Sequence, residues 1–324
     1  MATRYENYMS GSFGTAFTVW GSRWRAQTFT PVIGHKITSV KLALGRKGSP
    51  GIMTVSIRAV DANNRPTGPD LASGTINANT FLITPPASVR YEEITFDAGI
   101  DLSAGTMYAI VVRCLTGDAD INYARWEVDN GGTPYTGGEV ELSSDSGATW
   151  TEYGAGDFDF FFQDWGDPIL PTVTTQPVRG IEENTAIGNG NIIDSGGNNS
   201  ITQHGVCWNV TGTPTIADSK TQDGIVGAGP FSSQMTELLE NTLYSVRAYA
   251  TTAAGTGYGE EVSFTTGGPP LYWYHLNVKG VNLPYVDLDG TKKLHIVLKN
   301  LSPTMKLSGE YGKVKVKVDY EPAA

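Results

Sequence analysis

The chain has 324 residues, of which 39 are glycine and 17 proline, and its formal net charge at pH 7 is −10. This length predicts two or three domains, and the acidic excess argues against binding to a nucleic-acid backbone, which needs a basic surface. Strand-like runs are short and rich in Val, Ile, Thr and Tyr, and no segment keeps a helical apolar period over three turns. We therefore expect an all-β protein. The absence of about 18 consecutive apolar residues predicts no membrane span.

Residues 1–166 are expected to form the first domain. Apolar and polar residues alternate in four runs separated by turn-rich intervals: KITSVKLAL (36–44), MTVSIRAV (53–60), YEEITF (91–96) and MYAIVV (107–112). Together with AQTFTP at 26–31, this region resembles the jelly-roll domains found on bacterial surface proteins and beside carbohydrate-binding modules. The resemblance implies a jelly-roll β-sandwich, and it carries no catalytic signature.

Aromatic residues are dense in this first region and suggest contact with sugars. A flat aromatic ring can stack on the apolar C–H face of a pyranose, and the candidates are Trp20, Trp24, Trp126 and Tyr135. The alternative for each is ordinary packing in the sandwich. If host-surface glycans are bound, we expect the contact in this region.

The string SSDSGATW at 143–150 matches the Asp-box pattern S-x-D-x-G-x-T-W at every specified position. In that pattern the aspartate, here Asp145, accepts backbone hydrogen bonds across a tight hairpin. Gly147 supplies a conformation that other residues avoid, and Trp150 packs beneath. Families that carry the box include sialidases, where it lies away from the active site, so we interpret it as a turn device.

The sequence contains few residues spaced as metal ligands. Asp118, Asp120, Asn122 and Asp129 occupy offsets 1, 3, 5 and 12 of a calcium loop. Tyr123 stands where that loop needs glycine, and Asp129 replaces its bidentate glutamate, which leaves these four as weak calcium candidates. The four histidines are scattered and show no transition-metal spacing.

No signature of an enzyme is found among the motifs of nucleophilic, phosphate-binding or dinucleotide-binding proteins. The pair Asp157 and Asp159 in DFDFFFQDW could serve a glycosidase, but its alternation with phenylalanine favours a core strand with a polar outer face. We therefore expect neither catalysis nor a cofactor.

Residues 167–267 are expected to form a second sandwich, bounded by DWGDPIL and GGPP. The strings HGVCW (204–208) and RAYATTAAGTGYG (247–259) resemble divergent fibronectin type III modules of bacterial and phage surface proteins. The resemblance implies that Tyr244 closes the sandwich corner through its hydroxyl, although Glu240 replaces the usual turn proline. The two cysteines, Cys114 and Cys207, then fall in different domains, so we expect no disulfide.

Residues 268–324 are expected to form a small β-rich domain of opposite charge. This segment has eight basic and five acidic residues, whereas 1–166 has 12 and 18 and 167–267 has 3 and 10. In the run KVKVKV, Lys313, Lys315 and Lys317 share one strand face. These lysines either prevent edge-to-edge pairing of an exposed strand or form a surface that docks on acidic partners.

A function follows as an expectation from these features taken together. The N-terminal stretch MATRYENYMSGSFG lacks the apolar run of a secretory leader, whereas a phage virion leaves its host by lysis. We therefore expect a virion-surface structural protein on the head or tail, attached to other virion proteins by its last domain. The protein could form a homo-oligomer on the particle. The alternative is an extracellular or bacterial cell-surface carbohydrate-binding protein whose leader has been removed.

Overall fold

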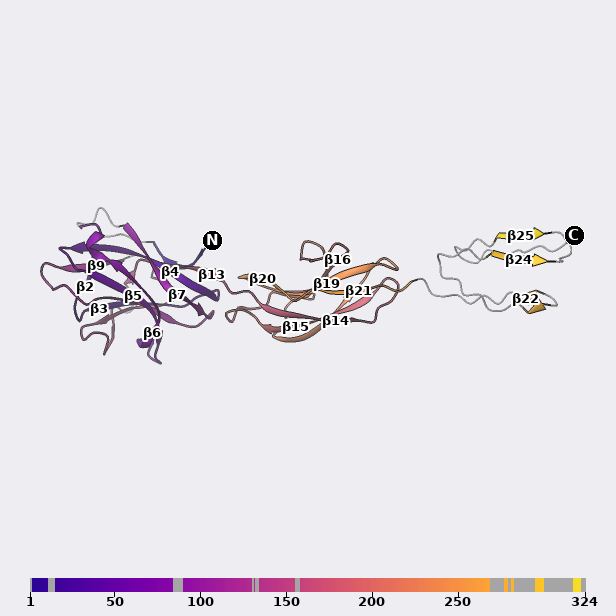
Figure 1. Ribbon diagram of the computed structural model, residues 1–324. Coiled ribbons are helices and arrows are strands. Elements are labelled where there is room, and N and C mark those ends of the chain that lie inside the picture. The colour runs from indigo at the N-terminus through magenta and orange to yellow at the C-terminus, as the bar shows by residue number, and fades with distance from the viewer. Residues whose placement is uncertain are drawn as a thin grey trace.

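The computed structural model describes residues 2–10, 15–83, 90–129, 131, 134–154 and 158–268, with short strands at 277–278, 281–282, 295–299 and 317–321. Throughout this described part the regular elements are strands and one 3-10 turn, η1 (Ala78–Thr80), which confirms the all-β prediction. Two β-sandwiches follow one another along the chain (Figure 1). Among the described residues there is no helix with the length and apolar character needed to cross a membrane.

The first sandwich consists of a seven-stranded and a six-stranded sheet whose pairings are antiparallel. The seven-stranded sheet has the order β1-β13-β4-β9-β12, with β2 added on β9 and β7 on β4. Its strands are β1 (Thr3–Tyr8), β2 (Thr15–Val19), β4 (His35–Lys47), β7 (Arg90–Leu102), β9 (Tyr123–Asp129), β12 (Asp159–Phe160) and β13 (Phe162–Pro168). The six-stranded sheet has the order β11-β10-β3-β8-β5-β6, formed by β3 (Trp24–Phe29), β5 (Ile52–Val60), β6 (Pro66–Asn77), β8 (Tyr108–Cys114), β10 (Val140–Ser143) and β11 (Thr151–Glu152).

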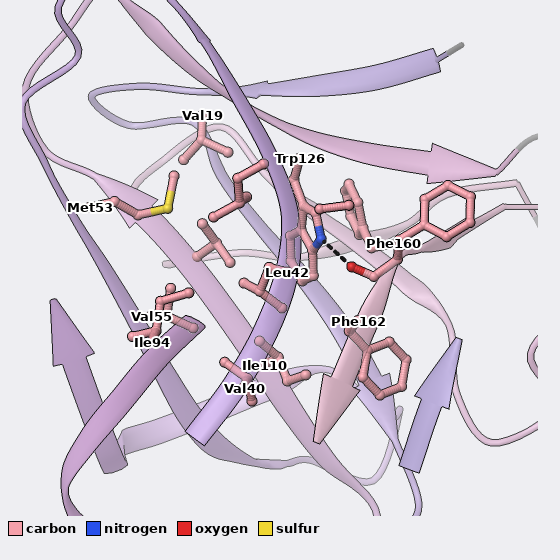
Figure 2. Packing of buried hydrophobic residues seen from close by; sticks show 14 of the residues in the cluster. Val19, Val40, Leu42, Met53, Val55, Ile94, Ile110, Trp126, Phe160 and Phe162 are labelled. Carbon is pink, nitrogen blue, oxygen red and sulfur yellow. Dashed lines mark hydrogen bonds between the residues drawn. The ribbon is translucent and has the colours of Figure 1, made fainter. Parts of the chain in front are cut away.

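Alternating apolar side chains of both sheets form the core between them (Figure 2). The largest is Trp126, which is fully buried and stacks on Phe160 with ring centroids 4.1 Å apart. Its indole Nε1 donates to the Phe161 carbonyl at 3.0 Å, so the ring enters the core with its polar atom satisfied. Burial of each large apolar side chain contributes about 1.5–3 kcal/mol to the free energy of folding.

The second sandwich has a three-stranded and a five-stranded sheet, each antiparallel. The smaller sheet is β14 (Thr172–Arg179), β15 (Ala186–Asp194) and β18 (Gly229–Met235). The larger is β17 (Ser219–Lys220), β16 (Gln203–Asn209), β19 (Leu243–Thr252) and β20 (Gly255–Tyr258), with β21 (Val262–Thr265) also on β19. This division of the strands is immunoglobulin-like, as the fibronectin type III resemblance implies.

The corner of the second sandwich is closed by Tyr244, as predicted. The backbone N–H of Leu239 donates to the Tyr244 hydroxyl oxygen at 3.0 Å, and the tyrosine ring is buried against Phe264. Glu240 lies next to this bond and does not prevent it, so the missing proline leaves the corner intact.

A loop of the second sandwich binds the first sandwich directly, and we call this contact the joint. The buried Asn199 accepts a hydrogen bond from Gly34 N at 2.7 Å and donates to Gly34 O at 3.0 Å. The Ala104 N–H also donates to Gly197 O at 2.8 Å. A Cβ atom at Gly34 would overlap the Gly197 carbonyl oxygen, so the two backbones approach as closely as glycine allows.

The cysteines are buried and free; Cys114 lies in the first core, and Cys207 lies on β16, where it pairs with Arg247 of β19. Of the last region, the structure describes β22 (Asn277–Val278) paired with β23 (Val281–Asn282), and β24 (His295–Lys299) paired in parallel with β25 (Lys317–Glu321). Lys317 begins β25, whereas Lys313 and Lys315 lie outside the described residues. Docking through the three lysines therefore stays a prediction.

Candidate functional site

Five loops gather at the end of the first sandwich that lies away from the joint, and we call them the distal loop surface. They are residues 20–23, 48–51, 81–83, 115–122 and 144–150. Strand β4 starts at His35 beside the joint and ends at Lys47, next to loop 48–51. Strand β8 starts four residues after Ala104 of the joint and ends at Cys114, next to loop 115–122. The fold therefore places this surface and the second sandwich at opposite ends of the first.

Hydrogen bonds between the loops hold the distal loop surface together. Ser146 N donates to Ser22 O at 2.9 Å, which joins loop 144–150 to loop 20–23. Ser49 N donates to Asn122 Oδ1 at 2.9 Å, and Lys47 Nζ donates to Asp120 O at 2.6 Å. Because these bonds fix the loops before any partner arrives, binding to this surface would cost little ordering entropy.

Aliphatic side chains project from the distal loop surface into solvent. The exposed fractions are 67% for Leu115, 62% for Ile121, 63% for Ile83 and 55% for Ile52. Leu115 and Ile121 lie in loop 115–122, Ile83 follows Phe81 and Leu82, and Ile52 begins β5 beside loop 48–51. The aromatic residues of the sequence did not indicate them. Binding residues often lie on loops that a rigid scaffold positions, so these side chains are the candidate contact groups of this surface.

The predicted calcium ligands do not form one site. The Asp118 carboxylate accepts from the backbone N–H groups of Ile121 at 2.7 Å and Asp120 at 2.9 Å, so it closes its own loop. The Ile121 N–H bond and the Asn122 side-chain bond lower the pKa of Asp118 to about 2. Asp129 lies at the other end of β9, where it accepts from the Tyr8 hydroxyl at 2.7 Å. In the described residues no three His, Cys, Asp or Glu side chains are placed to hold a metal ion.

The loop at 143–150 has the hydrogen bonds expected of a turn device. Asp145 accepts from the Thr149 hydroxyl at 2.6 Å and from the Thr149 N–H at 2.9 Å, and these bonds lower its pKa to about 2. Gly147 has φ +81°, and a Cβ atom there would lie 2.7 Å from Cε3 of Trp24. Trp150 is buried beside Trp24 in a small cluster on the outer face of the six-stranded sheet. The loop is therefore a rigid part of the distal loop surface. The Asp145 carboxylate is used in hydrogen bonds within its own turn.

The four aromatic candidates do not form a sugar-stacking platform, which corrects that expectation. Trp126 is fully buried in the core, and Tyr135 is half-buried with its hydroxyl 3.4 Å from Glu6 Oε2. Trp24 is 9% exposed, with the guanidinium groups of Arg58 and Arg113 at 5.5 and 5.3 Å from its ring. Trp20 alone of the four lies in a loop of the distal surface, half-buried with Arg23 at 5.5 Å from its ring.

Asp159 is buried, whereas the sequence predicted a polar outer face. It accepts from Gln27 Nε2 at 3.1 Å and from Tyr135 N at 2.7 Å, and its side chain is almost inaccessible to solvent. Burial raises the pKa of Asp159 to about 7. Its suggested partner Asp157 lies outside the described residues, so the glycosidase pair gains no support from the geometry.

The solved structures similar to this chain include several distant likenesses with low TM-scores. No protein-family model matches the chain, and no curated protein does. A myokine structure is 18% identical over 31% of this chain and 99% of its own, with a TM-score of 0.24. A redesigned β-sandwich protein is 21% identical over 30% and 93%, with a TM-score of 0.21, and titin domains A168–A170 are 9% identical over 81% and 99%, with a TM-score of 0.22. At these values the likenesses carry no argument about function.

Proposed function

We propose that this chain is a non-enzymatic adhesion and decoration protein displayed on the surface of a phage particle, on its head or tail. The distal loop surface carries this proposal, because the exposed aliphatic side chains of Leu115, Ile121 and Ile83 lie on hydrogen-bonded loops at the end opposite the joint. A protein that displays a binding end needs such a rigid, partly apolar tip on a spacer, and the second sandwich is suited to be the spacer.

The attachment to a particle is supported by sequence features. The strings HGVCW and RAYATTAAGTGYG resemble modules of phage and bacterial surface proteins, and the last region is basic in an otherwise acidic chain. We propose that Lys313, Lys315 and Lys317 dock on acidic virion proteins, because cationic side chains steer association with acidic surfaces and fix its register. Surface ion pairs contribute about 0–1 kcal/mol each, so apolar contacts of the same region would have to supply the remaining affinity.

The particle assignment is tested with particles assembled from either the full chain or a 1–267 truncation. After purification, immunoblotting should detect the full chain and should not detect the truncation. Truncated protein at full copy number would refute docking through the last region. Full chain found only in the bacterial surface fraction would refute the phage assignment and favour a cell-surface adhesion protein.

The binding end is tested separately with the full chain on host cells. The double variant Leu115→Asp with Ile121→Asp should lose most cell binding, because it places charge on the apolar tip. The matched control is Ile225→Asp, which alters a residue of the second sandwich that is 83% exposed. Equal binding by the double variant and the control would refute the role of the distal loop surface.

A further inference from the structure

The outer face of the three-stranded sheet in the second sandwich contains a hollow of about 470 Å³. Its lining includes Gly190 and Phe231 on neighbouring strands, with Pro177 and Pro230 beside them. A Cβ atom at Gly190 would overlap the Phe231 ring and lie 2.6 Å from Cβ of the core residue Ala248, so Gly190 and the Phe231 side chain face the core side of the sheet. Pro230 and Ser232, which flank Phe231 on β18, face outward. The volume lies within the range of about 300–1,000 Å³ that is usual for small-ligand sites.

A break in strand pairing creates this hollow. The register between β14 and β15 shifts between Gln176 and Arg179, so Pro177 leaves the regular ladder. The Asn189 side chain bridges the neighbouring strands at this break: its Nδ2 donates to Pro177 O at 2.8 Å, and its Oδ1 accepts from the Ser232 hydroxyl at 2.7 Å. The bulge is therefore held open by a side-chain network, and the hollow is formed in advance of any ligand.

The polar atoms around the hollow are suited to a ligand rich in hydroxyl groups. Gln176 Nε2 is bound to Thr174 Oγ1 at 3.0 Å, which turns the amide and leaves its oxygen as an acceptor. The Ser232 oxygen keeps acceptor capacity after donating to Asn189. The exposed surfaces of Pro177 and Pro230 next to these acceptors fit the apolar C–H groups of a sugar ring.

Arg179 adds a positive charge to the lining of this hollow. Residues 167–267 contain three basic and ten acidic residues. The side chains of the other two basic residues are hydrogen-bonded to the backbone: Lys220 Nζ donates to Ile216 O at 2.7 Å and Arg247 Nε to Gly259 O at 2.8 Å. Within the described residues, no carboxylate forms an ion pair with the exposed Arg179. A guanidinium can bind a carboxylate through two parallel N–H bonds.

We propose that this hollow binds an acidic saccharide, with a sugar carboxylate on Arg179 and a ring face against Pro177 and Pro230. The site lies in the second sandwich, away from the aromatic residues that the sequence favoured. It does not depend on the proposed particle attachment or on the distal loop surface, because binding of a soluble sugar is measured without a particle or a cell.

The test is isothermal titration calorimetry of the full chain with a galacturonic acid trimer and with the neutral galactose trimer. The acidic trimer should bind, and Arg179→Gln should weaken it by about ten- to a hundredfold, the range for one hydrogen-bonded charged group. The matched control is Lys220→Gln, which makes the same charge change elsewhere in the sandwich and should leave affinity within about twofold, since long-range effects are screened.

Three outcomes would overturn the proposal. They are no binding of the acidic trimer at millimolar concentration, equal binding by wild type and Arg179→Gln, and equal binding of the neutral trimer. Since the Arg179 side chain is exposed and makes no hydrogen bond or ion pair among the described residues, thermal melting should be unchanged in Arg179→Gln. A sugar-binding chain that is absent from particles would refute the proposed function alone, so the two failures are distinguishable.

Discussion

Asn199 is expected to control the joint between the two sandwiches, and Asn199→Ala tests this. The substitution removes both hydrogen bonds to Gly34, at 2.7 and 3.0 Å, while the Ala104 N–H bond to Gly197 O remains. Each lost bond costs about 1 kcal/mol, and a buried group left unpaired costs about 1–3 kcal/mol. Because opening of the joint lets water reach Gly34, we expect a loss of about 2–4 kcal/mol. That corresponds to about thirtyfold to nearly a thousandfold in the ratio of closed to open joint.

Native-state amide hydrogen exchange at Ala104 measures this ratio, because its N–H donates to Gly197 O across the joint and keeps that acceptor in the variant. Exchange at Ala104 should accelerate by that factor in Asn199→Ala, with unchanged protection in the two cores. The control is Asn198→Gly, which loses the 3.3 Å bond of an exposed side chain to Ala104 O, tolerates the φ of +56° at this position, and should accelerate exchange by less than about tenfold. Wild-type exchange at Ala104 in Asn199→Ala would refute the reasoning.

Three further predictions concern the stability of the sandwiches. Gly147→Ala should lower the unfolding free energy of the first sandwich by about 1–3 kcal/mol, because of its positive φ and the Trp24 contact; a neutral result in urea unfolding would contradict this. Tyr244→Phe should cost the second sandwich about 1 kcal/mol by removing the acceptor for Leu239 N–H, and an unchanged urea midpoint would refute that role. The pKa of Asp159 is raised from an ordinary 3.8 to about 7, so the folded state binds more protons than the unfolded state in this range. The contribution of Asp159 to the free energy of unfolding therefore falls as the pH rises from about 4 to about 7. Asp159→Asn should flatten this dependence, and parallel stability curves for variant and wild type would count against it.

Local patterns predicted the elements whose structure is decided locally. The alternation at 36–44 lies within β4, the Tyr244 corner forms, and Asp145 binds its own turn. In each case the partners are close in sequence or repeat with the period of a strand.

Features that depend on distant pairing could not be predicted in the same way. Whether Trp126 faces a sugar or the core depends on Phe160, which stacks on it from another strand. Asp159 is buried because Gln27, 132 residues away, bonds to it. The hollow near Arg179 likewise results from a register shift, which no run of residue types announces.

The joint has a consequence for protein engineering. Its first-sandwich side includes backbone atoms of Gly34 and Ala104, and its second-sandwich side includes the side chains of Asn198 and Asn199 and the Gly197 backbone. A domain grafted in place of the first sandwich would need a residue without a side chain at the position of Gly34, since any Cβ there would overlap the Gly197 carbonyl. The two sandwiches can thus be transplanted together as a fixed-length cassette, whereas a chimera that exchanges only one of them would lose the defined angle between the two.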